Sequence, residues 1–149
     1  MTGLLVVGGG AMGEGLLAGW VASGIPAAEI GVVEPHAARA ADLVARHGVR
    51  EATVDDAASA EVVVLAVKPN TVPKVLDALH GPLAPGALVI SIAAGVPLTV
   101  LEGALPGVAV VRVMPNTPAL VGKGMAGVVP GAAASDAQVE CAVGLMEAV

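Results

Sequence analysis

Three glycines directly after a short apolar run are the residues whose spacing points most clearly to chemistry. The run Leu-Leu-Val-Val comes first, and Gly8, Gly10 and Gly13 follow it. Gly8 lets the chain turn off a strand, Gly10 has no Cβ to keep a phosphate away, and Gly13 lets a helix pack closely. The first N–H groups of that helix, around Ala11 and Met12, attract anions. The spacing predicts a site for the pyrophosphate of a dinucleotide; the alternative is an ordinary glycine-rich turn.

A carboxylate stands at the end of the second apolar run. Glu34 follows the glycines by roughly 20 residues, as in dinucleotide-binding sites. An acid there accepts hydrogen bonds from the ribose hydroxyls of NAD, and its charge repels the 2′-phosphate of NADP. His36 and Arg39 leave the choice between NAD and NADP open, because the Arg39 guanidinium could donate two parallel hydrogen bonds to that phosphate. The alternative is that all three are solvated residues at a helix start.

Three later loops carry the remaining candidate residues. Lys68, the segment Ala93-Ala94-Gly95 and Asn116 each follow an apolar run. Small residues let a ligand approach the backbone closely, and the prolines on either side of Asn116 hold it in an extended turn. In a parallel sheet these loops would line one crevice. Lys68 taken alone is better explained as a solvated loop lysine.

The elements that position these residues alternate between strand and helix. A doubly wound, mostly parallel α/β sheet of the Rossmann type is therefore predicted, with helices on both faces. The continuous β-branched run 61–67 is typical of a central strand, and Asn70 is expected to cap the helix after it. The predicted strand order is 3-2-1-4-5-6, with the last strand added beside the sixth. The strands are predicted over residues 4–7, 30–33, 49–52, 61–67, 87–91, 108–113 and 125–129, and helices over 37–46, 55–59, 98–104 and from an N-cap at Ser135.

Composition limits the class of protein. The chain has 149 residues, of which 56% are apolar, enough for one α/β domain with a real core. Seven Lys and Arg residues and a net charge of −6 argue against a nucleic-acid surface. No apolar run approaches the roughly 20 residues of a membrane-spanning helix, and no basic segment precedes the first strand. We expect a cytoplasmic protein, with Cys141 as an inert thiol.

Four segments, in their order and spacing, resemble the N-terminal domain of pyrroline-5-carboxylate reductase. The resemblance runs over almost the whole chain, and the fourth segment together with the other three is highly specific. The segments are Gly8-x-Gly10-x-Met12-Gly13, Ala66-Val67-Lys68-Pro69, Ser91-Ile92-Ala93-Ala94-Gly95-Val96 and Arg112-Val113-Met114-Pro115-Asn116-Thr117-Pro118.

The resemblance implies hydride transfer from NADPH or NADH to the C=N bond of 1-pyrroline-5-carboxylate, which gives L-proline in the last step of proline biosynthesis. Thr53 stands where the family often has an asparagine near the adenosine. Glu34 differs from the small polar or basic residue of strongly NADP-preferring members, so we expect NADH to bind at least comparably to NADPH. No catalytic residue and no metal is assigned. The implied cofactor-binding residues are Gly8, Gly10, Ala11, Met12, Gly13, Glu34, Thr53, Ala66, Val67, Lys68, Pro69, Ile92, Ala93, Ala94 and Asn116.

The resemblance also implies a helical domain beyond residue 149, which in the family dimerises and supplies most substrate contacts. Residues 1–149 are then one NAD(P)-binding domain, and the full-length protein is a homodimer or a larger homo-oligomer. One alternative is another dehydrogenase of the same wider group, acting on a hydroxyacid or on prephenate, with a catalytic Lys or His in a later domain. The other is a nucleotide-binding module without catalysis, which would have no need of the Asn116 loop.

Overall fold

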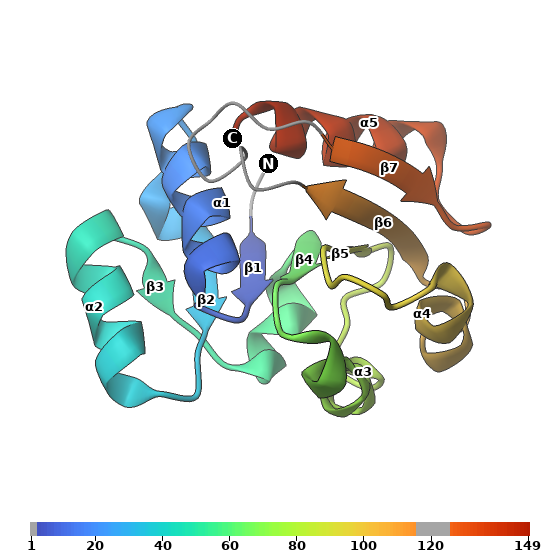
Figure 1. Cartoon of the computed structure of the whole chain (residues 1–149), viewed down its shortest axis with the longest axis horizontal. Helices are drawn as coiled ribbons and strands as arrows, with labels where there is room; N and C mark the ends of the chain where they lie inside the picture. Colours follow the sequence, from blue (N-terminus) through green and yellow to red (C-terminus); the bar gives the residue numbers. More distant parts are fainter. Residues whose placement is uncertain (1–2, 116–125) are drawn as a thin grey trace.

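The computed structural model describes residues 3–115 and 126–149, and this part of the chain forms one seven-stranded sheet (Figure 1). The strand order is β3-β2-β1-β4-β5-β6-β7, which confirms the predicted order and the edge strand. All neighbours pair in parallel except β6 and β7, which are antiparallel. The strands are β1 (Leu4–Val7), β2 (Ile30–Val33), β3 (Arg50–Glu51), β4 (Val62–Leu65), β5 (Leu88–Ser91), β6 (Ala109–Pro115) and β7 (Ala126–Pro130).

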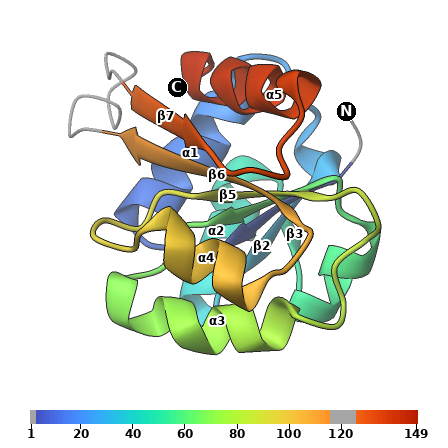
Figure 2. The same cartoon turned by 90° about the vertical axis from the view of Figure 1, so that its right-hand side faces the viewer.

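Helices cover both faces of the sheet (Figure 2). One core lies between the sheet and α1, α2 and α5, and the other lies between the sheet and α3 and α4. In β4, Val62 and Val64 belong to the first core, whereas Val63 and Leu65 belong to the second. This double burial explains the β-branched run and confirms the doubly wound fold. The helices are α1 (Ala11–Ala22), α2 (Ala37–His47), α3 (Val72–Leu79), α4 (Leu98–Ala104) and α5 (Asp136–Glu147), with short 3-10 turns η1 (Ala27–Glu29), η2 (Val54–Ser59) and η3 (Pro69–Thr71).

Some predicted boundaries were wrong. The strand expected over 61–67 is shorter, because the chain leaves the ladder after Leu65. Asn70 does not cap α3: the 3-10 turn η3 comes first, and Thr71 occupies the N-cap position. The Asn70 carboxamide oxygen instead accepts a hydrogen bond of 3.4 Å from the Thr71 hydroxyl. The 3-10 turn in the loop after β4 fixes where α3 begins. A single Asn in the sequence does not reveal such a turn.

The last helix is fixed at both ends. Ser135 caps it as predicted, since its hydroxyl accepts a hydrogen bond of 3.2 Å from the Gln138 amide. Near the other end, the buried Trp20 indole donates a 2.9 Å hydrogen bond from Nε1 to the carbonyl oxygen of Leu145. The lone tryptophan thereby joins α1 to α5 over the same face of the sheet. None of the helices in residues 3–115 and 126–149 is long and apolar enough to cross a membrane.

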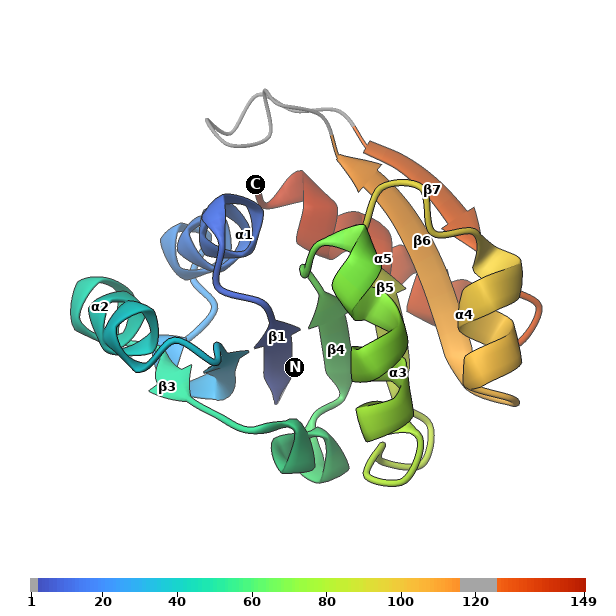
Figure 3. The same cartoon turned by 60° about the horizontal axis from the view of Figure 1, so that its bottom comes forward.

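The parallel strands bring their carboxyl ends to one edge of the sheet. Figure 3 shows the heads of β1, β4 and β6 pointing the same way, with β7 running in the opposite direction. The glycine turn, the loop after β4 and the loop after β5 all leave the sheet at this edge. In doubly wound folds this is the edge where ligands bind.

Candidate functional site

The glycine turn has the shape that its spacing predicts. Gly8 has a φ of 109°, and a Cβ there would stand 2.7 Å from the carbonyl oxygen of Ala66. A Cβ on Gly13 would overlap the Gly8 carbonyl oxygen, whereas a Cβ on Gly10 would meet nothing within 4 Å. Gly8 and Gly13 therefore need to be glycine for the turn itself. Gly10 faces open space, which is where a phosphate could approach the backbone.

The start of α1 offers backbone N–H groups at this open side. Gly10 is the N-cap, so no side chain caps the helix, and its carbonyl accepts the first helical hydrogen bond from Glu14 N at 2.9 Å. The N–H groups of Ala11, Met12 and Gly13 precede that bond and have no acceptor inside the helix. Together with the positive end of the helix dipole they form a cradle suited to an anion.

Glu34 lies beside the glycine turn and is part of its support. Its Oε1 accepts a hydrogen bond of 3.1 Å from Gly9 N, and its Oε2 accepts one of 2.9 Å from His36 N. The carboxylate is half-buried at the end of β2 and next to the turn, the position expected for a group that contacts ribose. His36 is exposed and contributes a backbone N–H to Glu34.

In this structure the Arg39 guanidinium is bound by protein acceptors and is not free to make a bidentate contact with a phosphate. Its Nε donates to the Gly9 carbonyl oxygen at 2.7 Å, Nη2 donates to Glu14 at 2.6 Å, and Nη1 donates to Asp42 at 3.3 Å. Every guanidinium nitrogen thus has a protein acceptor. Arg39 therefore connects α2 with the glycine turn.

Glu14 is the centre of a charge cluster that the sequence reasoning missed. Its carboxylate contacts Arg39 at 2.6 Å, Arg46 at 2.5 Å and His47 at 2.8 Å. The hydrogen bond from His47, followed by the hydrogen bond and charge of Arg39 and the charge of Arg46, lowers the pKa of Glu14 from 4.5 to about 2 despite the opposing effect of burial. Positions 39, 46 and 47 share one face of a helix, and that spacing is the signal that could have revealed the cluster.

The loop after β4 packs directly on the glycine turn. The Ala66 amide donates a 2.8 Å hydrogen bond to the Val7 carbonyl, and the Val67 side chain would come within 3.0 Å of a Cβ on Gly8. Lys68 is exposed and forms the N-cap of η3, in which Pro69 is the first residue. The structure therefore brings Ala66 and Val67 to the turn, and Lys68 and Pro69 follow them at the same edge of the sheet.

The loop after β5 lies at the same edge. Ile92 N donates to the Leu65 carbonyl at 3.1 Å, which holds this loop against the end of β4. The buried Ser91 hydroxyl accepts a 3.3 Å hydrogen bond from Ala93 N. Ala93 is buried and Ala94 is exposed, so the loop presents small residues to the solvent side of the edge.

Thr53, another predicted site residue, stands apart from this group. Thr53 is exposed after β3, and its amide donates a 2.7 Å hydrogen bond to Asp56 at the start of η2. It lies two strands away from β1, and its contact stabilises the local turn. Asn116 lies outside the described residues.

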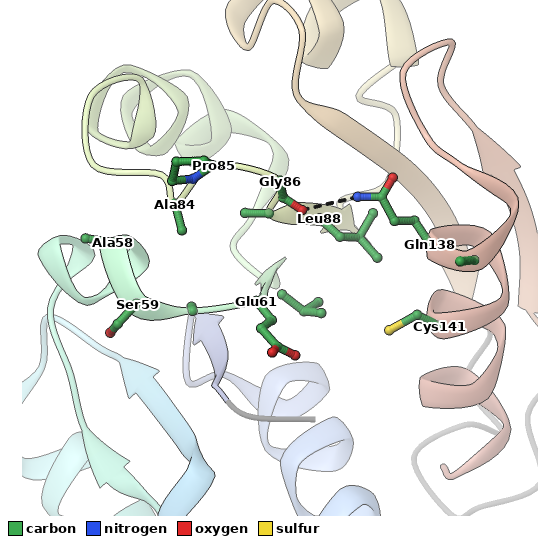
Figure 4. Close-up of a pocket in the computed structure, with 13 residues that line it drawn as sticks. Ala58, Ser59, Glu61, Ala84, Pro85, Gly86, Leu88, Gln138 and Cys141 are labelled. Carbon is green, nitrogen blue, oxygen red and sulfur yellow. Dashed lines mark hydrogen bonds between the residues drawn. The ribbon is translucent and has the colours of Figure 1, made fainter.

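A groove of about 470 Å³ lies at the opposite edge of the sheet (Figure 4). It is found at the amino ends of β4 and β5, between Glu61 and α5, where Gln138 Nε2 donates to the Gly86 carbonyl at 3.3 Å. Burial raises the pKa of the Cys141 thiol in its wall, in keeping with an inert cysteine. The groove contains none of the predicted site residues. Within residues 3–115 and 126–149, no three His, Cys, Asp or Glu side chains gather closely enough to hold a metal ion.

Two curated relatives of the chain carry the same enzyme name. The chain is 41% identical over 146 residues to the pyrroline-5-carboxylate reductase of Pseudomonas aeruginosa, an alignment that covers 96% of this chain and 54% of the relative. It is 38% identical over 155 residues to the enzyme of the same name from Corynebacterium melassecola, which covers 100% of this chain and 57% of the relative. The chain thus spans about half the length of the curated relatives it matches, and the predicted resemblance is confirmed.

Solved structures agree with this result. The pyrroline-5-carboxylate reductase of Coxiella burnetii superposes with a TM-score of 0.94 at 32% identity, over 99% of this chain and 56% of that chain. A prephenate dehydrogenase from A. aeolicus superposes with a TM-score of 0.79 at 16% identity and shares the fold. Residues 3–95, well over half of the chain, match the family described as "NADP oxidoreductase coenzyme F420-dependent". The chain therefore belongs to this family of NADP oxidoreductases.

Proposed function

We propose that this chain is the NAD(P)H-binding part of a pyrroline-5-carboxylate reductase, which reduces the C=N bond of 1-pyrroline-5-carboxylate to give L-proline. The observation that carries the proposal is the glycine turn, in which Gly10 faces open space at the same edge of the sheet as the loops after β4 and β5. Relatives of about 40% identity with this enzyme name support the substrate.

The residues at the edge of the sheet where the parallel strands end fit a dinucleotide. The uncapped N–H groups of residues 11–13 would hold the pyrophosphate, and Glu34 would face the adenosine ribose. We assign the segments 66–69 and 92–94 to the ribose and nicotinamide, Asn116 to the reacting end and Thr53 to the neighbourhood of the adenosine. Bound NAD(P)H supplies the hydride. The protein's own contribution is to bind, to orient the ring against the imine carbon and to exclude water.

Both NADH and NADPH are proposed as cofactors. The Glu34 carboxylate disfavours a 2′-phosphate by charge repulsion, and Arg39, which would favour it, is bound to Gly9, Glu14 and Asp42. We therefore propose that NADH binds at least as well as NADPH. The P. falciparum pyrroline carboxylate reductase, which shares this fold at 24% identity, was solved with NADP bound.

The activity test uses the purified gene product, that is, the protein as expressed from its gene, which contains these residues. We expect oxidation of NADH or NADPH to depend on 1-pyrroline-5-carboxylate and to yield proline. Prephenate and a panel of 2-hydroxyacids with the oxidised cofactors serve as comparison substrates, because prephenate and arogenate dehydrogenases share the fold. Turnover of one of those compounds without turnover of the imine would overturn the proposal.

We further propose that the gene product is a cytoplasmic homodimer or larger homo-oligomer and that residues outside 1–149 make most substrate contacts. The support is the resemblance to relatives that are about twice as long as this chain. Light scattering of the purified gene product measures the assembly, and a monomeric mass at micromolar concentration would contradict it.

A further inference from the structure

The backbone of Gly9, in the middle of the glycine turn, is held from two sides by side chains. Its N–H donates to Glu34 Oε1 at 3.1 Å, and its carbonyl accepts from Arg39 Nε at 2.7 Å. Gly9 is buried, and a Cβ there would come within 2.7 Å of Leu43 Cδ1 on α2. Helix α2 and the end of β2 therefore clamp this residue.

The clamp sets the direction of the next peptide group. In a trans peptide the C=O of one residue and the N–H of the next point in opposite directions. Because the Gly9 carbonyl is drawn toward Arg39, the Gly10 N–H points away from that guanidinium. Gly10 is the exposed N-cap of α1, with open space where a side chain would stand. The bond to Arg39 thus fixes the orientation of the turn at its exposed residue.

Arg39 is itself held in place by acids from two helices. Glu14 on α1 accepts from Nη2 at 2.6 Å, and Asp42 on α2 accepts from Nη1 at 3.3 Å. Arg46 and His47 also contact Glu14, which keeps that carboxylate between α1 and α2. A guanidinium with three acceptors in fixed directions has little freedom to turn toward another ligand.

We propose that Arg39 is a positioning residue that fastens the glycine turn through the Gly9 carbonyl, and that it is not a ligand of the cofactor 2′-phosphate. The proposal rests on the proposed binding of NAD(P)H at this turn. It predicts that Arg39 affects NADH and NADPH alike, because the pyrophosphate that the turn would hold is common to both. A 2′-phosphate ligand would affect NADPH alone.

The test compares Arg39→Ala and Arg39→Lys with Arg50→Ala. Arg50 is a matched control, because its Nε also donates to a backbone carbonyl at 2.7 Å, that of Ala28, away from the turn. Fluorescence titration gives the Kd of each cofactor. Amide hydrogen exchange is measured without cofactor at Gly9 and Glu14, whose N–H groups donate to Glu34 Oε1 and to the Gly10 carbonyl. For Arg39→Ala we expect both Kd values to rise by a similar factor, about tenfold, and faster exchange in the turn. Arg50→Ala should change neither.

The outcomes separate this proposal from the proposed function. A loss of NADPH affinity with unchanged NADH affinity would overturn the positioning role and make Arg39 a phosphate ligand. Unchanged exchange at both Gly9 and Glu14 in a folded Arg39→Ala protein would also overturn it. If the wild type binds neither cofactor, the proposed function fails, while the exchange measurement still decides whether Arg39 holds the turn. If Arg39→Ala does not fold, Arg39→Lys takes its place, since one ammonium cannot keep all three contacts.

Discussion

At the scale of single residues, Glu34 has two tasks that a sequence motif cannot separate. Its negative charge stands where the cofactor ribose is proposed to bind, and its Oε1 holds the Gly9 N–H. A substitution that removes the charge can therefore also loosen the turn. Gln keeps an oxygen acceptor for that N–H, whereas Ser is too short to reach it.

We predict that Glu34→Gln shifts the ratio of NADH to NADPH affinity toward NADPH by about tenfold, or about 1.4 kcal/mol, because the repulsion of the 2′-phosphate disappears. Glu34→Ser should shift the ratio in the same direction and weaken NADH binding as well, because Gly9 loses its acceptor. Competitive titration of both cofactors on the three proteins measures this. An unchanged ratio in both variants would show that Glu34 does not select the cofactor.

Glu14 gives a prediction about acid stability. Its pKa lies at about 2 in the folded chain, against 4.5 for an ordinary glutamate. Because the folded value is depressed, the ionised carboxylate stabilises the fold fully above pH 4.5, and this contribution is lost as the pH falls toward 2. Glu14→Gln should therefore unfold at lower urea than the wild type at pH 7, with a difference that shrinks below pH 4.5. A difference that is constant from pH 7 to pH 2 would contradict this account.

At the scale of elements, the strand order could be predicted because it depends on repeated, local patterns. Each strand is a short apolar run followed by a turn and a helix, and the right-handed crossover leaves few arrangements of such units. The contacts of Glu14 could not be predicted with the same ease, because its partners lie 25 to 33 residues away on another helix. The Asn70 cap failed for a related reason, since the 3-10 turn after β4 depends on how the loop packs.

The glycine turn allows a paired prediction that separates its folding from its binding. Gly13→Ala should lower stability by about 1–3 kcal/mol, because a Cβ would overlap the Gly8 carbonyl and the helix must shift. Gly10→Ala should leave the melting temperature nearly unchanged, because its Cβ meets nothing within 4 Å. It should nevertheless weaken NADH and NADPH binding strongly, because that Cβ would stand where the phosphates approach. Thermal melts and cofactor titrations test both variants.

The outcome for Gly10→Ala is decisive for the site. If that variant melts like the wild type and binds both cofactors as well, the open side of the turn is not where the pyrophosphate lies. Loss of both stability and binding would instead mean that the turn needs a glycine at position 10 for its own shape.

At the scale of the whole molecule, the edge of the sheet at the carboxyl ends of the strands presents groups suited to binding a dinucleotide. It presents few groups that could take part in the reaction of a substrate. It presents backbone N–H groups, small residues of the 92–94 loop and the exposed Lys68. Imine reduction needs the imine carbon held against the nicotinamide and shielded from water. Alignment of these 149 residues with the Pseudomonas aeruginosa enzyme reaches only 54% of that enzyme's length.

We therefore predict that residues 1–149, made alone, bind NADH and NADPH but form no proline. The glycine turn, Glu34 and the loops after β4 and β5 all lie within these residues, so the cofactor site should form, whereas the substrate would remain open to solvent. Cofactor fluorescence measures binding, and proline formation is compared with the gene product at equal concentration. Proline formation by the isolated 149 residues would show that they complete the site without further chain. Failure of a folded sample to bind either cofactor would show that the dinucleotide site needs more than this domain.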